Sequence, residues 1–253
     1  MRFFIEIAFK GTAYHGWQVQ ENATTVQGTI DAALATLLKR PVETVGAGRT
    51  DTGVHAEQMF AHFDLHENTD IGDPDKLLHQ LNRIIPEDIF IRNIFKVDEK
   101  AHARFDATSR TYEYRISLRK DPFLTGYAWF LPYQPDIELM NKAAQLLFDY
   151  KDFSCFSKSN TQVFTNNCRI LKAEWRRDED QLIFTIRADR FLRNMVRAIV
   201  GTLIETGKAR MGMEEFRAVL ESKNRSMAGA SVPACGLYLI GIEYPYPLIK
   251  LNA

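Results

Sequence analysis

Hydrophobic and polar residues alternate at the start of the chain, which predicts a strand over residues 2–9. Apolar residues then recur every three or four positions from Val26 to about Lys39, which is the period of an amphipathic helix. Thr24 and Gln27 would form the capping box at its start. Similar patterns predict a second helix that begins at Asp73-Pro74, and strands over 43–47, 56–64 and 89–97. The order of elements in this part of the chain is therefore βαββαβ.

The second half of the chain repeats this order with a different sequence. The predicted elements are a strand over 107–118, a helix capped by Asp136, a loop over 151–168, strands over 169–177 and 181–189, a helix from about Phe191 to Thr206, a short helix over 213–222 and a strand over 237–243. Two such units in succession are typical of ferredoxin-like (split βαβ) arrangements. We therefore predict an α+β protein with two ferredoxin-like subdomains, residues 1–105 and 106–253. We expect mainly antiparallel sheets and a cleft between the subdomains.

Composition narrows the class of protein. Hydrophobic residues make up 45% and charged residues 25% of the 253 residues, the balance of a soluble globular protein. No apolar run approaches the roughly 20 residues that cross a bilayer, and Glu6 interrupts the start too early for a signal peptide. The three cysteines lack paired metal-ligand spacing, which favours reduced thiols. We expect a cytoplasmic protein with no membrane partner.

The distribution of charge differs between the two halves. The chain has no net charge, but residues 1–100 carry 10 Lys and Arg against 15 Asp and Glu. Residues 101–253 carry 22 against 17, so the second half is basic. A basic half can bind a polyanion even in a neutral protein.

The segment 46–56 combines three glycines with Arg49, Asp51 and His55 between two predicted strands. Glycines at this density supply backbone angles that other residues avoid, and they allow a bulky ligand to approach the main chain. We interpret the segment as an active-site loop that presents the Asp51 carboxylate. The alternative is a hairpin turn stabilised by an Arg49–Asp51 ion pair. A second glycine-bounded loop, 11–18, is expected to expose its aromatic side chains.

Three arginines, Arg190, Arg193 and Arg197, lie at positions i, i+3 and i+7 and would share one face of the predicted helix. The planar guanidinium binds phosphate oxygens through two parallel hydrogen bonds, so this face could follow an RNA backbone. Arg169 and Arg187 lie nearby in sequence. The alternative is the solvated face of an ordinary amphipathic helix.

The strand over 107–118 places Arg110, Tyr112 and Tyr114 on one face. Aromatic rings interleaved with arginines suit stacking on bases and contact with phosphates. Cross-strand aromatic packing explains the same pattern equally well.

Several common chemistries lack their motifs in this sequence. There is no HExxH or CxxC pattern for a metal, no GxxxxGK[ST] loop for nucleotide phosphates, and no GxGxxG after a strand. A serine-hydrolase elbow is also absent. We therefore expect neither a metal site nor an ATP or NAD cofactor.

The family resemblance is carried by one motif, Gly48-Arg49-Thr50-Asp51-Thr52-Gly53-Val54-His55-Ala56. It resembles the catalytic signature of the tRNA pseudouridine synthase A family. The sequence departs from the family pattern at Thr52, where alanine is commoner, and at residues 57–59. Other segments that resemble the family, and extend the resemblance over nearly the full length, are 11–18, 25–27, 104–112, 191–197 and 233–239.

The resemblance implies isomerisation of uridine to pseudouridine at positions 38 to 40 in the anticodon stem-loop of tRNA, by a homodimer that needs no metal or organic cofactor. Asp51 would act as the nucleophile at C1′ of the ribose or assist elimination, and would have to be ionised in either role. The other residues that the resemblance places at the substrate are Arg49 on the flipped nucleotide, Tyr112 on the uracil ring, Arg197 beside the Asp51 carboxylate, and Arg110, Arg193 and His55.

Two other functions compete with this interpretation. A non-catalytic RNA-binding protein or RNA chaperone of the same fold would have no need of the Asp51 carboxylate, which is present here with Arg49 and Tyr112. A metal-dependent nuclease would need clustered carboxylates or histidines, which the sequence does not show.

Overall fold

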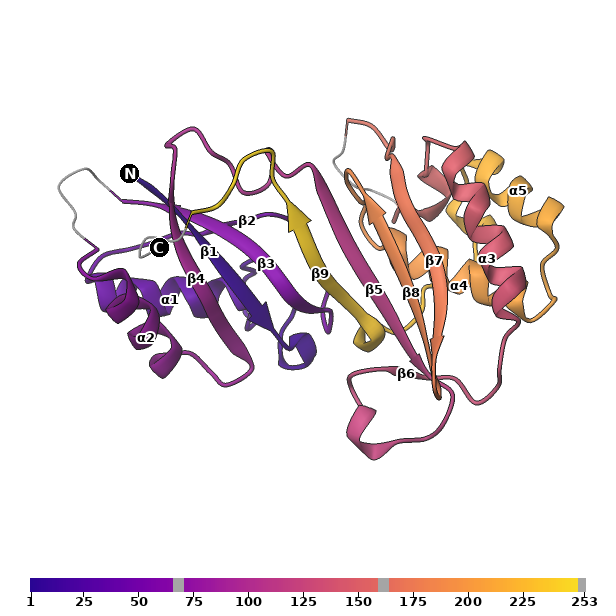
Figure 1. The fold of residues 1–253 in the computed structure, drawn as a ribbon, viewed down its shortest axis with the longest axis horizontal. Coiled ribbons are helices and arrows are strands. Elements are labelled where there is room, and N and C mark those ends of the chain that lie inside the picture. Colours follow the sequence, from indigo (N-terminus) through magenta and orange to yellow (C-terminus); the bar gives the residue numbers. More distant parts are fainter. Residues whose placement is uncertain (66–70, 159–163, 250–253) are drawn as a thin grey trace. The chain divides into compact units, whose positions relative to one another are not determined.

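The computed structural model describes residues 1–65, 71–158 and 164–249. They form two compact units, one from Met1–Thr108 with the residues from Leu239 on, and the other from Ser109–Tyr238 (Figure 1). The sequence places the division three residues earlier, after residue 105. It also assigns the final segment to the second subdomain, whereas the structure groups that segment with the first unit. The reason is strand β9 (Leu237–Glu243), which lies next to β3 (His55–Asp64) in the sheet.

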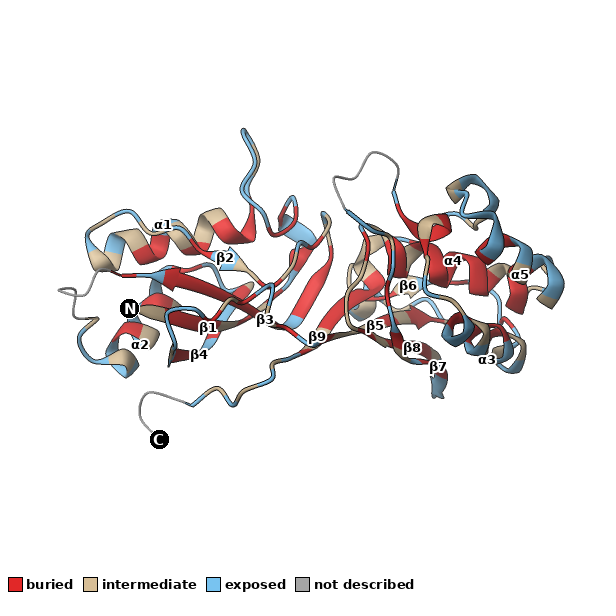
Figure 2. Cartoon of the chain, turned by 90° about the horizontal axis from the view of Figure 1, so that it is seen from above, coloured by how far each residue is buried: buried red, intermediate tan, exposed pale blue. Residues whose placement is uncertain are grey.

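The first unit has the predicted order of elements. They are β1 (Arg2–Phe9), α1 (Val26–Leu38), β2 (Val45–Gly46), β3, α2 (Pro74–Ile84) and β4 (Ile89–Val97). β1 pairs antiparallel with β3 and with β4, and β2 pairs with two residues of β3. Figure 2 shows β1 and β3 as buried over most of their length, so the core of this unit lies on these central strands.

The second unit repeats the arrangement with additional elements. They are β5 (Ser109–Ser117), β6 (Trp129–Phe130), α3 (Ile137–Gln145), β7 (Ile170–Asp178), β8 (Gln181–Ala188), α4 (Met195–Gly207) and α5 (Met213–Ser222). β8 pairs antiparallel with β5 and β7, whereas the short β6 runs parallel to β5. Helix α4 is buried along most of its length and packs against α3 (Figure 2). The predicted α+β class with mainly antiparallel sheets is therefore confirmed.

Helix caps agree with the sequence in two places and differ in one. Asp73 accepts hydrogen bonds from the first backbone amides of α2, and Asp136 does the same for α3, as predicted. For α1 the capping residue is Thr25 rather than Thr24, because the Thr25 hydroxyl accepts from the Gly28 amide at 3.2 Å. The Gln27 side chain donates to the Thr44 carbonyl at 2.6 Å instead of completing a capping box.

The predicted helix over 191–206 begins only at Met195. Asn194 adopts the left-handed conformation with φ 66°, which an asparagine tolerates but which cannot continue a right-handed helix. Arg190 and Arg193 therefore precede the helix, and of the three predicted arginines only Arg197 lies on it. The expectation that the three share one helical face was wrong.

The predicted loop over 151–168 has little regular structure in its described parts, residues 151–158 and 164–168. It contains the 3-10 helix η4 (Ser154–Phe156), which follows the 3-10 helix η3 (Leu146–Asp149). In the described residues, no helix combines the length and the apolar character required to span a bilayer.

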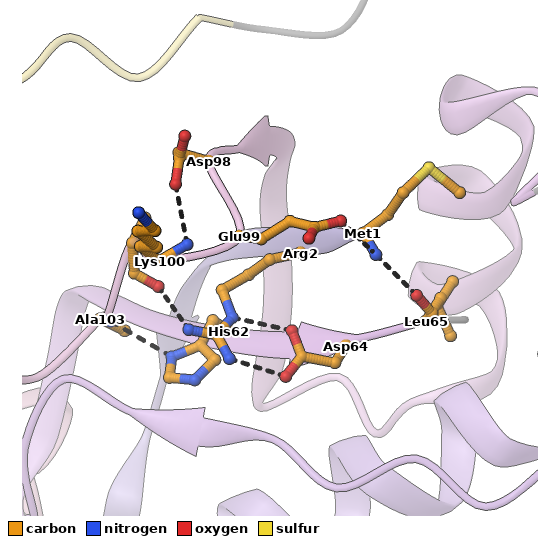
Figure 3. A network of polar contacts seen from close by, with 10 residues as sticks. Met1, Arg2, His62, Asp64, Leu65, Asp98, Glu99, Lys100 and Ala103 are labelled. Atoms are coloured by element: carbon orange, nitrogen blue, oxygen red, sulfur yellow. Dashed lines mark hydrogen bonds and ion pairs between the residues drawn. The ribbon is translucent and has the colours of Figure 1, made fainter. Parts of the chain in front are cut away.

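A polar network joins the start of β1 to the end of β3 (Figure 3). The Arg2 guanidinium donates to both oxygens of the Asp64 carboxylate at 2.7 Å and to the Ala101 carbonyl at 2.8 Å. His62 is buried in β3, and its Nδ1 accepts from the Ala103 amide at 3.2 Å. Burial lowers the pKa of His62 to about 4, and the nearby charge of Arg2 acts in the same direction.

We expect this histidine to make the protein less stable in mild acid. Below pH 6.5 the unfolded chain binds a proton at His62 that the folded protein does not bind until about pH 4. The folded state therefore loses about 2 kcal/mol between pH 7 and pH 5 through this group alone. Urea unfolding of the wild type and of His62→Gln at both pH values measures the effect, since other titrating groups are common to the two proteins. Equal losses in both proteins would contradict the assignment.

Candidate active site

The loop that carries Asp51 connects β2 to β3. Its first part is fixed by the Ala47 amide, which donates to the Phe60 carbonyl of β3 at 2.8 Å. A turn follows, in which the Val54 amide donates to the Asp51 carbonyl at 3.2 Å. Gly53 within this turn has φ 78°, a conformation that favours glycine. Asp51 therefore begins a closed turn, and its side chain is half-buried.

The segment that follows β1 supports the loop on both sides of Asp51. The Trp17 amide donates to the Thr50 carbonyl at 3.3 Å, and the Gly53 amide donates to the Tyr14 carbonyl at 3.4 Å. The backbone is thus hydrogen-bonded one residue before Asp51 and two residues after it. Such bonds restrict the positions that the carboxylate can adopt.

The aromatic residues of this supporting segment are buried, contrary to the sequence expectation. Tyr14 is 4% and Trp17 is 2% exposed. The Tyr14 hydroxyl donates to Asp88 at 2.5 Å, and burial is the main cause that raises its pKa. Trp17 can approach because Gly46 has no side chain, since a Cβ there would lie 2.4 Å from the indole nitrogen. These aromatics therefore support the loop from within the core.

Gly46→Ala should destabilise the protein by about 1–3 kcal/mol, because the rigid indole of Trp17 would have to move. Gly48→Ala is the matched control in the same loop, since a Cβ at Gly48 meets no atom within 4 Å. Urea unfolding of the two variants measures the difference. Similar stabilities would show that Trp17 adjusts without cost.

Arg49 is exposed and does not stabilise the turn. Among the residues that the structure describes, its guanidinium forms neither an ion pair with Asp51 nor another hydrogen bond. The alternative of a hairpin held by an Arg49–Asp51 pair is therefore wrong. An exposed cation two residues from a carboxylate in a hydrogen-bonded turn is instead well placed to bind an anionic ligand.

His55 begins β3 and is 1% exposed. Its Nδ1 accepts from the Gly11 amide at 3.1 Å, so the ring links the loop to the segment after β1. This contact explains a structural role for His55, and its predicted role at the substrate remains a prediction.

The β5 side chains differ in accessibility although they share one face. Tyr114 is fully buried, and its hydroxyl donates to the Pro233 carbonyl at 2.7 Å. Tyr112 is half-buried, with the Phe191 ring perpendicular to its own at 5.1 Å between centroids. The structure therefore assigns Tyr114 to the core, and Tyr112 is the more accessible of the two for a base.

Asp189 organises the arginines around the end of β8, a role that the sequence did not suggest. Its carboxylate accepts from the amides of Arg169 and Arg190 at 2.8 and 2.7 Å. Its carbonyl accepts from the Arg110 guanidinium at 2.9 Å. One aspartate thus brings three of the predicted RNA-binding arginines to one end of the sheet. Its position next to Arg190, directly after a strand, was the available signal.

The remaining arginines lie at the start of α4. Arg193 is exposed, and its carbonyl accepts from the Lys158 amide at 3.2 Å. Arg197 is half-buried on the helix, and its Nε donates to the Val232 carbonyl at 2.7 Å. Asp51 belongs to the first unit and Arg197 to the second, so the pairing of the two side chains remains a prediction.

In the described part of the chain, no three His, Cys, Asp or Glu side chains are grouped so that they could hold a metal ion. The thiols of Cys155 and Cys168 are buried, and this burial raises the pKa of each to about 12. Both are therefore protonated at neutral pH and unsuited to nucleophilic chemistry.

Similarity to known proteins extends over nearly the whole chain. A family model described as tRNA pseudouridine synthase matches residues 143–245. A tRNA pseudouridine synthase A of Parabacteroides distasonis is 53% identical over 251 residues, which cover 99% of each chain. The chain belongs to the tRNA pseudouridine synthase A family. A protein of the same name from Bacteroides fragilis is 49% identical, and the match covers 98% of each chain. Another from Treponema denticola is 39% identical, and the match covers 97% of this chain and 94% of the relative.

Membership of the tRNA pseudouridine synthase A family confirms the predicted resemblance and the predicted class of enzyme, an isomerase. It favours the enzyme over the non-catalytic RNA-binding protein of the same fold. The relatives extend over both units, so the match includes the Asp51 loop as well as the arginines of the second unit.

Proposed function

We propose that the protein isomerises uridine to pseudouridine at positions 38 to 40 in the anticodon stem-loop of tRNA, with Asp51 as the nucleophile. The observation that carries this proposal is the Asp51 turn, which is hydrogen-bonded on both sides and bears the exposed guanidinium of Arg49 two residues away. A carboxylate on a hydrogen-bonded turn beside an exposed cation suits an anionic substrate with a reactive sugar carbon.

The reaction breaks the bond between N1 of uracil and C1′ of the ribose and forms a bond between C5 and C1′. The hydrogen on C5 leaves as a proton, and N1 gains one, so the product is an isomer of the substrate. A carboxylate can serve this exchange by adding to C1′ as the bond to N1 breaks, and it leaves C1′ again when C5 of the detached uracil attacks that carbon. In the alternative route it can remove the C2′ proton while the ribose eliminates the base to give a glycal, and return that proton when C5 bonds to C1′.

The other predicted residues would bind the nucleotide and the RNA. The target uridine must leave its stack, at a cost of a few kcal/mol, before C1′ can reach Asp51. Arg49 would hold the flipped nucleotide, and Tyr112 would stack on its base. We assign Arg110 and Arg193 to RNA phosphates and Arg197 to the Asp51 carboxylate. His55 would support the loop at the substrate.

We also propose that the enzyme acts as a cytoplasmic homodimer in which one tRNA contacts both subunits. Sedimentation at micromolar protein concentration tests the oligomeric state, and a monomer would contradict it.

The proposed reaction is tested with tRNA that carries tritium at C5 of uridine. Pseudouridine formation releases this tritium to water, so wild-type protein should release it from anticodon-arm uridines. Substrates in which positions 38, 39 or 40 are replaced in turn locate the reacting base. The proposal fails if no substrate with an anticodon-arm uridine releases tritium.

A further inference from the structure

A short segment after α5 lies directly against helix α4. It connects the 3-10 helix η5 (Arg225–Met227) to the 3-10 helix η6 (Ala234–Gly236). The Gly229 amide donates to the Thr202 hydroxyl of α4 at 2.9 Å. A Cβ at Gly201 would lie 1.8 Å from the Ala230 carbonyl oxygen, so the two backbones meet without an intervening side chain.

Arg225 holds this segment in its bent path. Its Nη1 donates to the Gly229 carbonyl at 3.0 Å, and its Nη2 donates to the Ser231 hydroxyl at 2.8 Å. A longer contact of 3.5 Å reaches the Ala228 carbonyl. Within the described residues no carboxylate contacts this half-buried guanidinium. The planar guanidinium of arginine has several N–H donors in a fixed geometry, so it can bind several acceptors at once. The single ammonium group of lysine cannot reach all of them.

The held segment contacts Arg197, which the proposed function uses, and the core residue Tyr114. The Val232 carbonyl accepts from Arg197 Nε at 2.7 Å, and the Val232 amide donates to the Arg197 carbonyl at 3.3 Å. The next carbonyl, that of Pro233, accepts from the Tyr114 hydroxyl at 2.7 Å. Tyr114 lies two residues from Tyr112 on β5. The segment therefore holds the Arg197 side chain directly. It also holds β5, the strand that carries Tyr112, through the hydrogen bond to Tyr114.

Ser231 connects the same segment to the start of α4. Its hydroxyl accepts from the Asn194 side chain as well as from Arg225. Asn194 is the left-handed residue that sets where α4 begins, three residues before Arg197. Arg225, Ser231 and Asn194 thus form one chain of hydrogen bonds that ends at the helix carrying Arg197.

We propose that Arg225 is a positioning residue for the isomerase reaction, which acts by holding the segment 228–233 so that Arg197 keeps the orientation that its proposed role requires. This inference rests on the proposed function. It assigns to Arg225 no contact with the substrate. A displacement of about 1 Å in a positioned group can reduce a rate about 100-fold, so the loss of an indirect contact can be large.

The test is a set of single-turnover measurements of tritium release at saturating enzyme, with wild type, Arg225→Ala, Arg197→Ala and the double variant. Arg225→Ala should reduce the rate about 10- to 100-fold and leave the dissociation constant for tRNA within about 3-fold. The double variant should be no slower than Arg197→Ala, because Arg225 acts through Arg197. Multiplicative losses in the double variant would overturn the proposal.

Three further variants complete the test. Lys223→Ala is the control, since this exposed lysine lies two residues away and forms an ion pair with the half-buried Asp152 at 3.1 Å. It should leave the rate unchanged, and a loss equal to that of Arg225→Ala would overturn the assignment. Arg225→Lys should restore only part of the rate. If Arg225→Ala does not fold, Ser231→Ala replaces it in the same comparison with Arg197→Ala. Wild-type activity separates failure of this inference from failure of the proposed function.

Discussion

Asp51→Asn is expected to abolish tritium release, with a loss of roughly 1000-fold or more in the single-turnover rate. Asparagine has the size and shape of aspartate but cannot act as a nucleophile or carry the negative charge that either route at C1′ requires. Losses of this size accompany removal of a nucleophile in other enzymes. The experiment therefore tests the central assignment of the proposed function.

The substitution should leave the loop in place. The turn uses the Asp51 carbonyl, which accepts from the Val54 amide, and the neighbouring bonds involve the backbone of Thr50 and Gly53. None of these bonds depends on the carboxylate. Asparagine also keeps the size of aspartate and one acceptor oxygen, so we expect the dissociation constant for tRNA to stay within about 3-fold and the urea midpoint to stay close to that of the wild type.

Asp73→Asn provides the matched control. Asp73 is an exposed aspartate that caps α2, and asparagine is an equally good capping residue. Its activity should equal that of the wild type. A wild-type rate for Asp51→Asn would refute the nucleophile. A joint loss of tRNA binding and stability would show instead that Asp51 is chiefly structural.

The helices and strands could be predicted from the sequence because the spacing of apolar residues that defines each one is visible within a short stretch of chain. Strand β4 has the predicted bounds, Ile89–Val97, and β1 and β3 agree to within one residue. The start of α4 could not be predicted in this way. The apolar pattern continues through residues 191–194, but the backbone there depends on Asn194 and on its contact with Ser231, 37 residues away.

Burial of the loop aromatics depended on a contact that the local sequence does not show. Trp17 lies in a glycine-bounded loop, and an aromatic residue there is often exposed. In the structure it fills the space left by the missing side chain of Gly46, 29 residues later. The position of strand β9 could not be predicted for the same reason, because β9 lies next to β3, which is far from it in the sequence.

The residues of the candidate site could be predicted where they belong to a sequence motif. They could not be predicted where their positions depend on hydrogen bonds to backbone groups. The segment 46–56 identified Asp51 and Arg49 by residue type and spacing. Asp189 and Arg225 have no such signature. Their partners are amides, carbonyls and a hydroxyl, groups that nearly every residue offers, so their roles emerge only from the folded structure.

Gly201→Ala is the second substitution with a large expected effect, a loss of about 3 kcal/mol or more in the free energy of unfolding. Alanine favours a helix by about 1 kcal/mol over glycine, so helix propensity alone predicts stabilisation. The new Cβ would lie 1.8 Å from the Ala230 carbonyl oxygen, and no rotation of a side chain can relieve a contact with backbone. The segment 228–233 would have to leave α4.

Gly28→Ala separates these two effects, because Gly28 also lies inside a helix, α1. A Cβ there would be 3.2 Å from the Thr25 hydroxyl oxygen, a contact that a small shift relieves. This variant should change stability by less than about 1 kcal/mol. If Gly201→Ala proves equally harmless, the close approach of the segment to α4 is not required for stability. If it is destabilising as expected, the variant studied at low temperature, where it stays folded, should also lose activity, because Val232 moves away from Arg197.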